Sequence, residues 1–175
     1  MVYVFMGGLE ASKTVPVPVS AQDLDKSEGF MVNSFVCELP YDASYLAENL
    51  IDPAHIPVSH DATEGGGKKE NATPYVMEVA ESDVKGIRGR FREEKKDIWT
   101  DLSFESPCII RYRTEARGFV FGAALHCLPL GQGKSRLMFR TFFKANWLIH
   151  TIFKLKKPMW ARHLNSNKIL EQDVG

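Results

Sequence analysis

The chain of 175 residues is long enough for one domain with a substantial core and too short for two. Hydrophobic residues make up 44% and charged residues 25% of the sequence, which excludes an intrinsically disordered chain. The 22 Lys and Arg residues balance the 22 Asp and Glu residues, so no net charge attracts the protein to nucleic acid. We therefore expect one folded domain without a nucleic-acid partner.

The three cysteines lie far apart in the sequence and include no C-x-x-C pair. An odd number without short spacing indicates neither a disulfide framework nor a zinc knuckle. We expect Cys37, Cys108 and Cys127 to be reduced, mostly buried thiols.

The first thirty residues do not read as part of the main core. The apolar run at 1–8 stops at two glycines, too early for a membrane span, and predicts a strand. Pro16 and Pro18 favour an extended connector over residues 11–30. Residues 31–39 alternate as a strand does, and Pro40 ends the run.

A helix is predicted from about Tyr45, because the short side chain of Asp42 or Ser44 can accept hydrogen bonds from the free amides of its first turn. Pro53 cannot donate to the carbonyl four residues earlier, so the helix should be disturbed there and again at Pro57.

Residues 75–144 show short runs of period two, typical of antiparallel strands joined by hairpins. After Lys144 the period becomes helical, with Pro158 expected to kink or split a long helix. The predicted fold is α+β: a curved antiparallel sheet wrapped around a long C-terminal helix, with a cavity between the two.

The stretch "ENLIDPAHIPVSH" (residues 48–60) concentrates metal-binding side chains. On an ideal helix, residues five apart diverge by roughly 140°, so His55 and His60 converge only if Pro57 breaks the helix between them. Two histidines and one carboxylate suit a non-haem Fe(II) site, and Asp173 or Glu171 offers the third ligand. The alternative is two histidines bonded to backbone carbonyls at a proline-rich helix end. A zinc hydrolase fits less well, because no glutamate accompanies the histidines as in H-E-x-x-H.

The same stretch resembles the mononuclear-iron motif of Rieske-type oxygenases, in which Asn, Asp, His and His follow one another with this spacing. The form "DPAHIPxSH" is similar in particular to the pheophorbide a oxygenase and chlorophyllide a oxygenase group. Further segments resemble that group, including "LSFESPCIIRYR", "GFVFGAALHCLPLGQGKSRLMFR" and "MWARHLNSNKILEQDVG". The resemblance covers nearly all of the chain after about residue 30.

The resemblance implies residue roles. His55, His60 and Asp173 would be Fe(II) ligands. Asp52 would bond to a ligand histidine and link it to the Rieske centre of a neighbouring subunit, and Asn49 would lie near the iron.

The family's cluster domain holds a [2Fe-2S] centre through C-x-H and C-x-x-H pairs, which this sequence lacks. We therefore expect residues 1–30 to be a remnant strand of that domain plus a linker, and residues 31–175 to be an oxygenase catalytic domain truncated at its C-terminus. The chain itself is not expected to bind the cluster, and alone it is expected to be inactive.

The resemblance further implies a large aromatic or tetrapyrrole substrate, derived from chlorophyll, and a chloroplast location. Electrons would come from a subunit that carries a Rieske domain or from a ferredoxin-like donor, and we expect a homo-oligomer. Some full-length relatives add membrane helices. The alternative function is a non-catalytic module of the same fold that binds apolar ligands.

Overall fold

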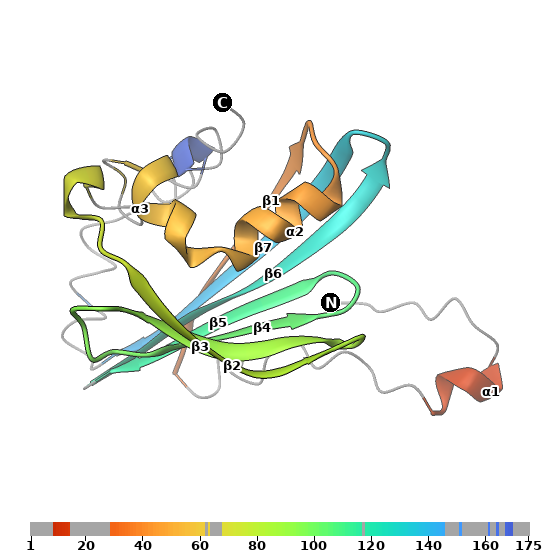
Figure 1. The fold of residues 1–175 in the computed structure, drawn as a ribbon. Coiled ribbons are helices and arrows are strands. Elements are labelled where there is room, and N and C mark those ends of the chain that lie inside the picture. Colours follow the sequence, from red (N-terminus) through yellow and green to blue (C-terminus); the bar gives the residue numbers. More distant parts are fainter. Residues whose placement is uncertain are drawn as a thin grey trace.

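A curved antiparallel sheet of seven strands forms the centre of the computed structural model, which describes residues 9–14, 29–61, 63, 68–116, 118–145, 151, 161, 164 and 167–169. Its strand order is β1-β7-β6-β5-β4-β3-β2. The strands are β1 (Met31–Leu39), β2 (Tyr75–Asp83), β3 (Gly86–Glu93), β4 (Thr100–Glu105), β5 (Ile109–Ala116), β6 (Phe119–Gly131) and β7 (Lys134–Ala145). Figure 1 shows helix α2 (Ala43–Ile51) lying across the hollow of this sheet.

The core lies on the concave face, where every second side chain of the central strands is buried. Because successive residues of a strand point to opposite faces, one set of alternate side chains is buried against the core. The buried set consists of Phe91, Leu102, Ile110, Ala123, Leu125, Cys127 and Leu137. The predicted period-two strands joined by hairpins are confirmed by the antiparallel pairs β5–β6 and β6–β7.

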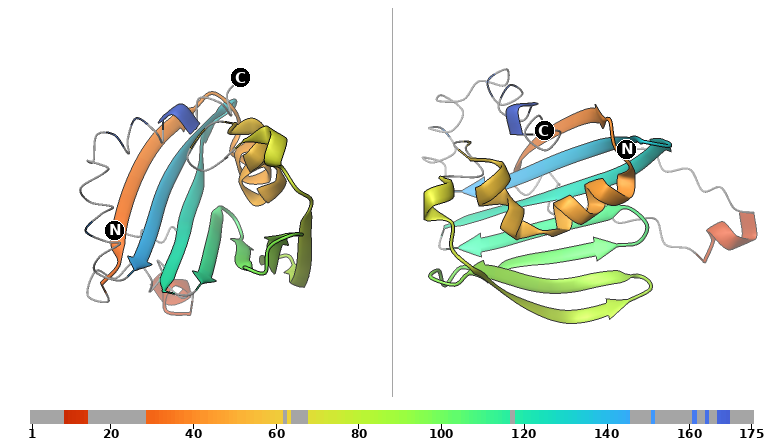
Figure 2. Two further views of the ribbon diagram at one scale, coloured as in Figure 1. Left: turned by 90° about the vertical axis from the view of Figure 1, so that its left-hand side faces the viewer. Right: turned by 45° about the horizontal axis from the view of Figure 1, so that its top comes forward.

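Strand β1 occupies one edge of the sheet, paired with β7 so that Cys37 stands opposite Leu137. The chain then crosses the concave face through α2, the 3-10 turn η3 (Pro53–His55), α3 (Ile56–Ser59) and the 3-10 turn η4 (Lys69–Asn71) to reach β2 at the opposite edge. The right-hand view of Figure 2 shows this crossing. The residues of the predicted metal motif thus lie on a connection held over the core.

Leu46 fixes α2 to the sheet, since its side chain is only 1% exposed and belongs to the core cluster. The predicted helix start is confirmed, with Asp42 at the N-cap. Its carboxylate makes no bond to the first turn, however, and accepts instead from the backbone N–H of Gly133 at 2.9 Å. A predicted local cap is therefore replaced by a tertiary contact.

Near the N-terminus the structure differs from the prediction, and most of both chain ends lies outside the described residues. A short helix, α1 (Leu9–Ser12), stands where the connector was predicted to begin, and residues 1–8 and 15–28 lie outside the described residues. The predicted long C-terminal helix also falls mostly outside them, although residues 151, 161, 164 and 167–169 are helical. Over the described residues, no helix has the length and apolar character needed to cross a membrane.

Candidate metal centre

The break at the end of α2 is built by two consecutive residues, Asp52 and Pro53. The ring of Pro53 has no N–H to give to the carbonyl of Asn49, so the helix ends at Ile51 and the N–H of Asp52 bonds to that carbonyl instead, at 3.3 Å. The carboxylate of Asp52 then caps the following turn η3 by accepting from the N–H of Ala54 at 2.8 Å. The predicted disturbance at Pro53 is confirmed, and it re-aims the chain just before His55.

The second proline starts a new turn. Pro57 lies in the first turn of α3, where a missing N–H is not needed, and the N–H of His60 closes this turn on the carbonyl of Ile56 at 3.0 Å. The change from η3 to α3 brings the two imidazoles together, with ring centroids 5.2 Å apart and planes at 75°. Two residues that an ideal helix would point apart therefore converge.

His55 and His60 have different surroundings. The Nδ1–H of His55 donates to the backbone carbonyl of Asp52, since a carbonyl can only accept, and this leaves Nε2 with its lone pair. A ligating histidine commonly donates its other ring N–H to a carbonyl or carboxylate in this way. His60 is buried, at 5% exposure, and Thr63 donates its hydroxyl to the His60 carbonyl at 2.7 Å.

This pair fits a shared metal ion. Each ligating ring nitrogen stands about 2 Å from a bound cation, so two rings at 5.2 Å between centroids can share one ion. Within the described part of the chain, no three His, Cys, Asp or Glu side chains gather as a complete metal site. Asp173 and Glu171, the predicted third ligands, lie outside that part, so their role stays a prediction.

The described contacts of Asp52 and Asn49 differ from the side-chain roles that the resemblance implies. Asp52 is exposed and meets His55 through its main-chain carbonyl, while its carboxylate is used as the cap of η3. The described contact of Asn49 is likewise made by its backbone carbonyl. The predicted side-chain roles of both residues remain predictions.

Tyr112 is a residue near the motif that sequence reasoning did not single out. Its hydroxyl donates to the carbonyl of Leu50, in the last turn of α2. Burial, and after it the nearby Asp52 and Cys127, raise the pKa of the Tyr112 phenol above its ordinary value. Only the alternation that placed Tyr112 on the core face of β5 hinted at this position.

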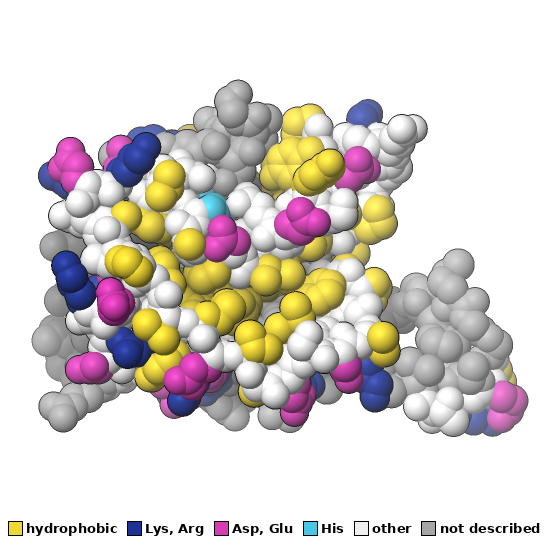
Figure 3. All heavy atoms as spheres, viewed as in Figure 1, with side chains coloured by type: hydrophobic (Ala, Val, Ile, Leu, Met, Phe, Trp, Pro, Cys, Tyr) yellow, Lys and Arg dark blue, Asp and Glu magenta, His cyan; other side chains and the backbone are white. Residues whose placement is uncertain are grey.

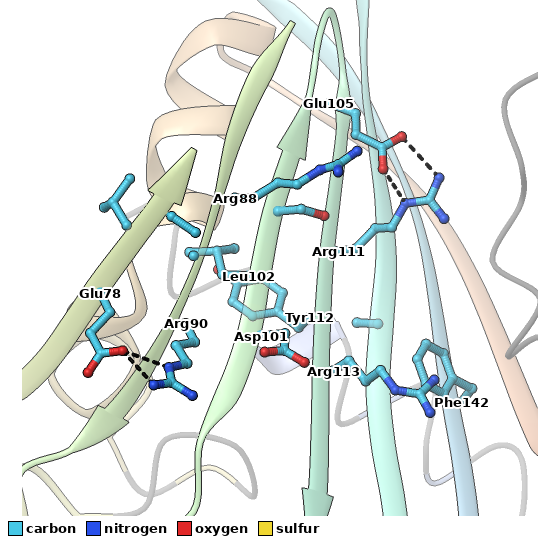
Figure 4. Close-up of a pocket in the computed structure, with 15 residues that line it drawn as sticks. Glu78, Arg88, Arg90, Asp101, Leu102, Glu105, Arg111, Tyr112, Arg113 and Phe142 are labelled. Atoms are coloured by element: carbon cyan, nitrogen blue, oxygen red, sulfur yellow. Dashed lines mark hydrogen bonds and ion pairs between the residues drawn. The ribbon is translucent and has the colours of Figure 1, made fainter. Parts of the chain in front are cut away.

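A cavity of about 790 Å³ lies on the other face of the sheet. Figure 4 shows its wall of charged side chains from β2 to β5, which alternate with the core residues and so point away from α2. Two ion pairs lie in this wall: Arg90 with Glu78 at 2.7 Å and Arg111 with Glu105 at 3.2 Å. This cavity is separate from the histidine pair. The cavity predicted between sheet and C-terminal helix involves residues that the structure does not describe.

Solved structures share this fold. NdmA from Pseudomonas putida CBB5 superposes with a TM-score of 0.63 at 12% identity, over 91% of this chain and 42% of that chain, and NdmB from the same organism gives 0.61 at 13%. At this identity the likeness concerns the fold alone. The sheet-dominated fold is similar to the helix-grip-like catalytic domain of Rieske-type oxygenases, as expected, but the expected long C-terminal helix is not shown in the described residues.

Sequence comparison then identifies the family. Residues 104–175 match the family model described as pheophorbide a oxygenase. Protein TIC 55 of Arabidopsis thaliana is 39% identical over 155 residues, covering 84% of this chain, and chlorophyllide a oxygenase of Oryza sativa subsp. japonica is 25% identical, covering 99%. The chain thus belongs to the Rieske-type group of pheophorbide a oxygenase and chlorophyllide a oxygenase, which confirms the resemblance.

The chain spans 28% of the length of that TIC 55 protein and 32% of that chlorophyllide a oxygenase. Both relatives are chloroplastic proteins by name, which supports the predicted chloroplast location.

Proposed function

We propose that this chain contributes the catalytic domain of a mononuclear non-haem iron oxygenase acting on a large aromatic or tetrapyrrole substrate. The observation that carries this proposal is the convergence of His55 and His60, whose ring centroids lie 5.2 Å apart beyond a proline-broken helix. Family membership supports the reaction class, and the histidine pair supports a site at this position of the chain.

The proposed ligands are His55, His60 and one carboxylate from 171–173, with Asp173 preferred because it matches the acidic position of the family. Two imidazoles and a carboxylate on one side of Fe(II) leave positions open, and the ion would supply the activation of dioxygen. The chain's own part is to orient the imidazoles. The carbonyl of Asp52 fixes the His55 tautomer, and burial of His60 limits its movement.

Asp52 is proposed as the route by which electrons enter from a Rieske-domain-bearing subunit or another donor. Its exposure, directly beside His55, supports this role, because a partner can reach its carboxylate without displacing the core. The sequence contains neither cysteine-histidine pair of a [2Fe-2S] centre, so the cluster has to come from elsewhere.

The concave face offers an apolar surface for a flat substrate. Met77 and Val79 on β2 are 46% and 57% exposed, and the strand register places them on the same face as the core residues Phe91 and Leu102. Figure 3 shows apolar side chains gathered along the trough between α2 and the β2–β3 hairpin. Relatives named flavonoid 8-hydroxylase 2 and chlorophyllide a oxygenase support an aromatic or tetrapyrrole substrate class.

Anaerobic loading of the purified, metal-free chain with Fe(II), followed by metal analysis, tests the proposal. We expect about one iron per chain in the wild type and a clear loss in His55→Ala and His60→Ala, since removing one of three ligands leaves too few. His126→Ala is the matched control, because His126 lies on the opposite face of the sheet. Absence of iron in the loaded wild type would instead favour the non-catalytic module that binds apolar ligands.

A further inference from the structure

The carbonyl of Leu50 loses its helical partner at the break. In a continuous α-helix it would accept from the N–H of residue 54. That N–H, from Ala54, is instead bonded to the carboxylate of Asp52 at 2.8 Å. The residues that end α2 therefore leave a carbonyl over the core in need of another donor, and such a group is costly if it stays unpaired.

Tyr112 supplies that donor from the sheet. Its hydroxyl donates to the Leu50 carbonyl across 62 residues of chain. Its ring is held on β5, with its backbone between Leu102 and Ala123 in register, and it packs edge-on against Phe91 at 6.0 Å and 86°. A side chain from the middle of the sheet is thus hydrogen-bonded to the last turn of α2.

We infer that Tyr112 is a positioning residue of the proposed iron centre, acting through the backbone from Leu50 to Asp52; this inference rests on the proposed function. Leu50 is two residues before Asp52, whose carbonyl accepts the Nδ1–H of His55. Fixing the Leu50 carbonyl therefore fixes the carbonyl that orients His55. The route runs from the Tyr112 hydroxyl to Leu50, along the main chain to Asp52, and to the imidazole.

The Tyr112 hydroxyl is suited to act as a permanent hydrogen-bond donor. Burial and the neighbouring Asp52 raise the pKa of Tyr112, so its hydroxyl keeps its proton across the physiological pH range. Tyr75 provides a matched comparison: it is partly buried, lies on the same face and also packs against Phe91, with centroids 5.7 Å apart. Removing the Tyr75 hydroxyl leaves the donor to Leu50 in place.

The test compares Tyr112→Phe and Tyr75→Phe in the full chain by two measurements. The first is hydrogen exchange of the amides of Asp52, Ala54, Ile56 and His60, all hydrogen-bonded in the structure. The second is titration with Co(II), followed through its visible absorption, which reports affinity and ligand geometry. Melting temperature and near-ultraviolet circular dichroism check that each variant folds.

We expect Tyr112→Phe to speed exchange of these amides by about 10-fold, because an unpaired carbonyl makes local opening easier. Its Co(II) affinity should fall by about 10-fold, the scale found when an outer partner of a ligand is lost, with a changed absorption band. Tyr75→Phe should behave as the wild type in both measurements.

Wild-type exchange and wild-type Co(II) affinity in Tyr112→Phe would overturn the inference. So would faster exchange spread evenly over the sheet with unchanged affinity, since that is the signature of a merely structural tyrosine. If the wild type itself binds no Co(II), the proposed function fails separately. Hydrogen exchange alone then tests whether Tyr112 holds this segment. Faster exchange of these four amides in Tyr112→Phe would support that role, and unchanged exchange would contradict it.

Discussion

The carboxylate of Asp42 accepts a hydrogen bond from the N–H of Gly133 at 2.9 Å, across 91 residues of chain. This contact ties the first turn of α2 to the turn between β6 and β7, as Tyr112 ties its last turn to β5. Leu46 packs into the core between them. The helix that leads into the histidine pair is thereby held at both ends and in its middle.

Replacing Asp42 by Ala should lower the free energy of unfolding by about 1.5 kcal/mol, because a charge-assisted, partly buried hydrogen bond to Gly133 is lost. Urea denaturation measures this change. The control is Asp97→Ala in an exposed loop, where a surface substitution should change the free energy by no more than about 0.5 kcal/mol. Equal effects of the two substitutions would contradict a special role for Asp42.

Gly122 permits the close approach of an aromatic ring on the outer face of the sheet. A Cβ at this position would lie 2.3 Å from Cζ of Phe142 and 2.3 Å from the carbonyl oxygen of Tyr112. Since the backbone oxygen cannot move freely, Gly122→Ala should cost about 3 kcal/mol of unfolding free energy. Gly118→Ala is the comparison: it has open space but a φ of +82°, so it should cost only about 1 kcal/mol. A neutral Gly122→Ala would show that Phe142 and the Tyr112 carbonyl can both move aside.

His126 should make the stability depend on pH. Burial, with Arg111 and Arg140 nearby, lowers its pKa below the ordinary 6.5, and the Met138 carbonyl and Glu105 oppose this only in part. The unfolded state therefore binds more protons than the folded state as pH falls below 6.5, so this contribution to stability is complete above 6.5 and is lost on acidification.

The variant His126→Gln removes the titration and keeps a hydrogen-bond donor. Denaturation at pH 7.5 and at pH 5 should show a smaller loss of stability in this variant than in the wild type. Identical losses would mean that other groups, such as paired carboxylates, dominate the loss of stability at acidic pH.

Local patterns predicted much of this molecule. The period-two pattern predicted the strands that carry the core residues Ile110 and Leu137, and the missing N–H of Pro53 predicted where α2 ends. These features depend on neighbouring residues alone, which is why a single sequence reveals them.

Long-range partners could not be read in the same way. Asp42 has the right position for a cap, yet a donor 91 residues away competes successfully for its carboxylate. The donor to Leu50 is Tyr112, 62 residues away, and no local pattern connects the two. The convergence of the histidines depends on the exact backbone angles of two short turns, which the prolines permit without specifying.

The two functions of Asp52 can be separated by one conservative change. Asp52→Asn keeps the main-chain carbonyl that accepts from His55 and keeps a side-chain oxygen that can accept from Ala54, while it removes the negative charge. We therefore expect Asp52→Asn to retain Co(II) affinity within about 3-fold, below the roughly 10-fold loss typical of a disrupted outer partner. In an assembly with a reduced Rieske-domain partner, the same variant should slow reoxidation of the cluster, because the proposed electron route runs through this carboxylate. A tenfold weaker Co(II) site in Asp52→Asn would show instead that the carboxylate, and not the carbonyl, supports His55.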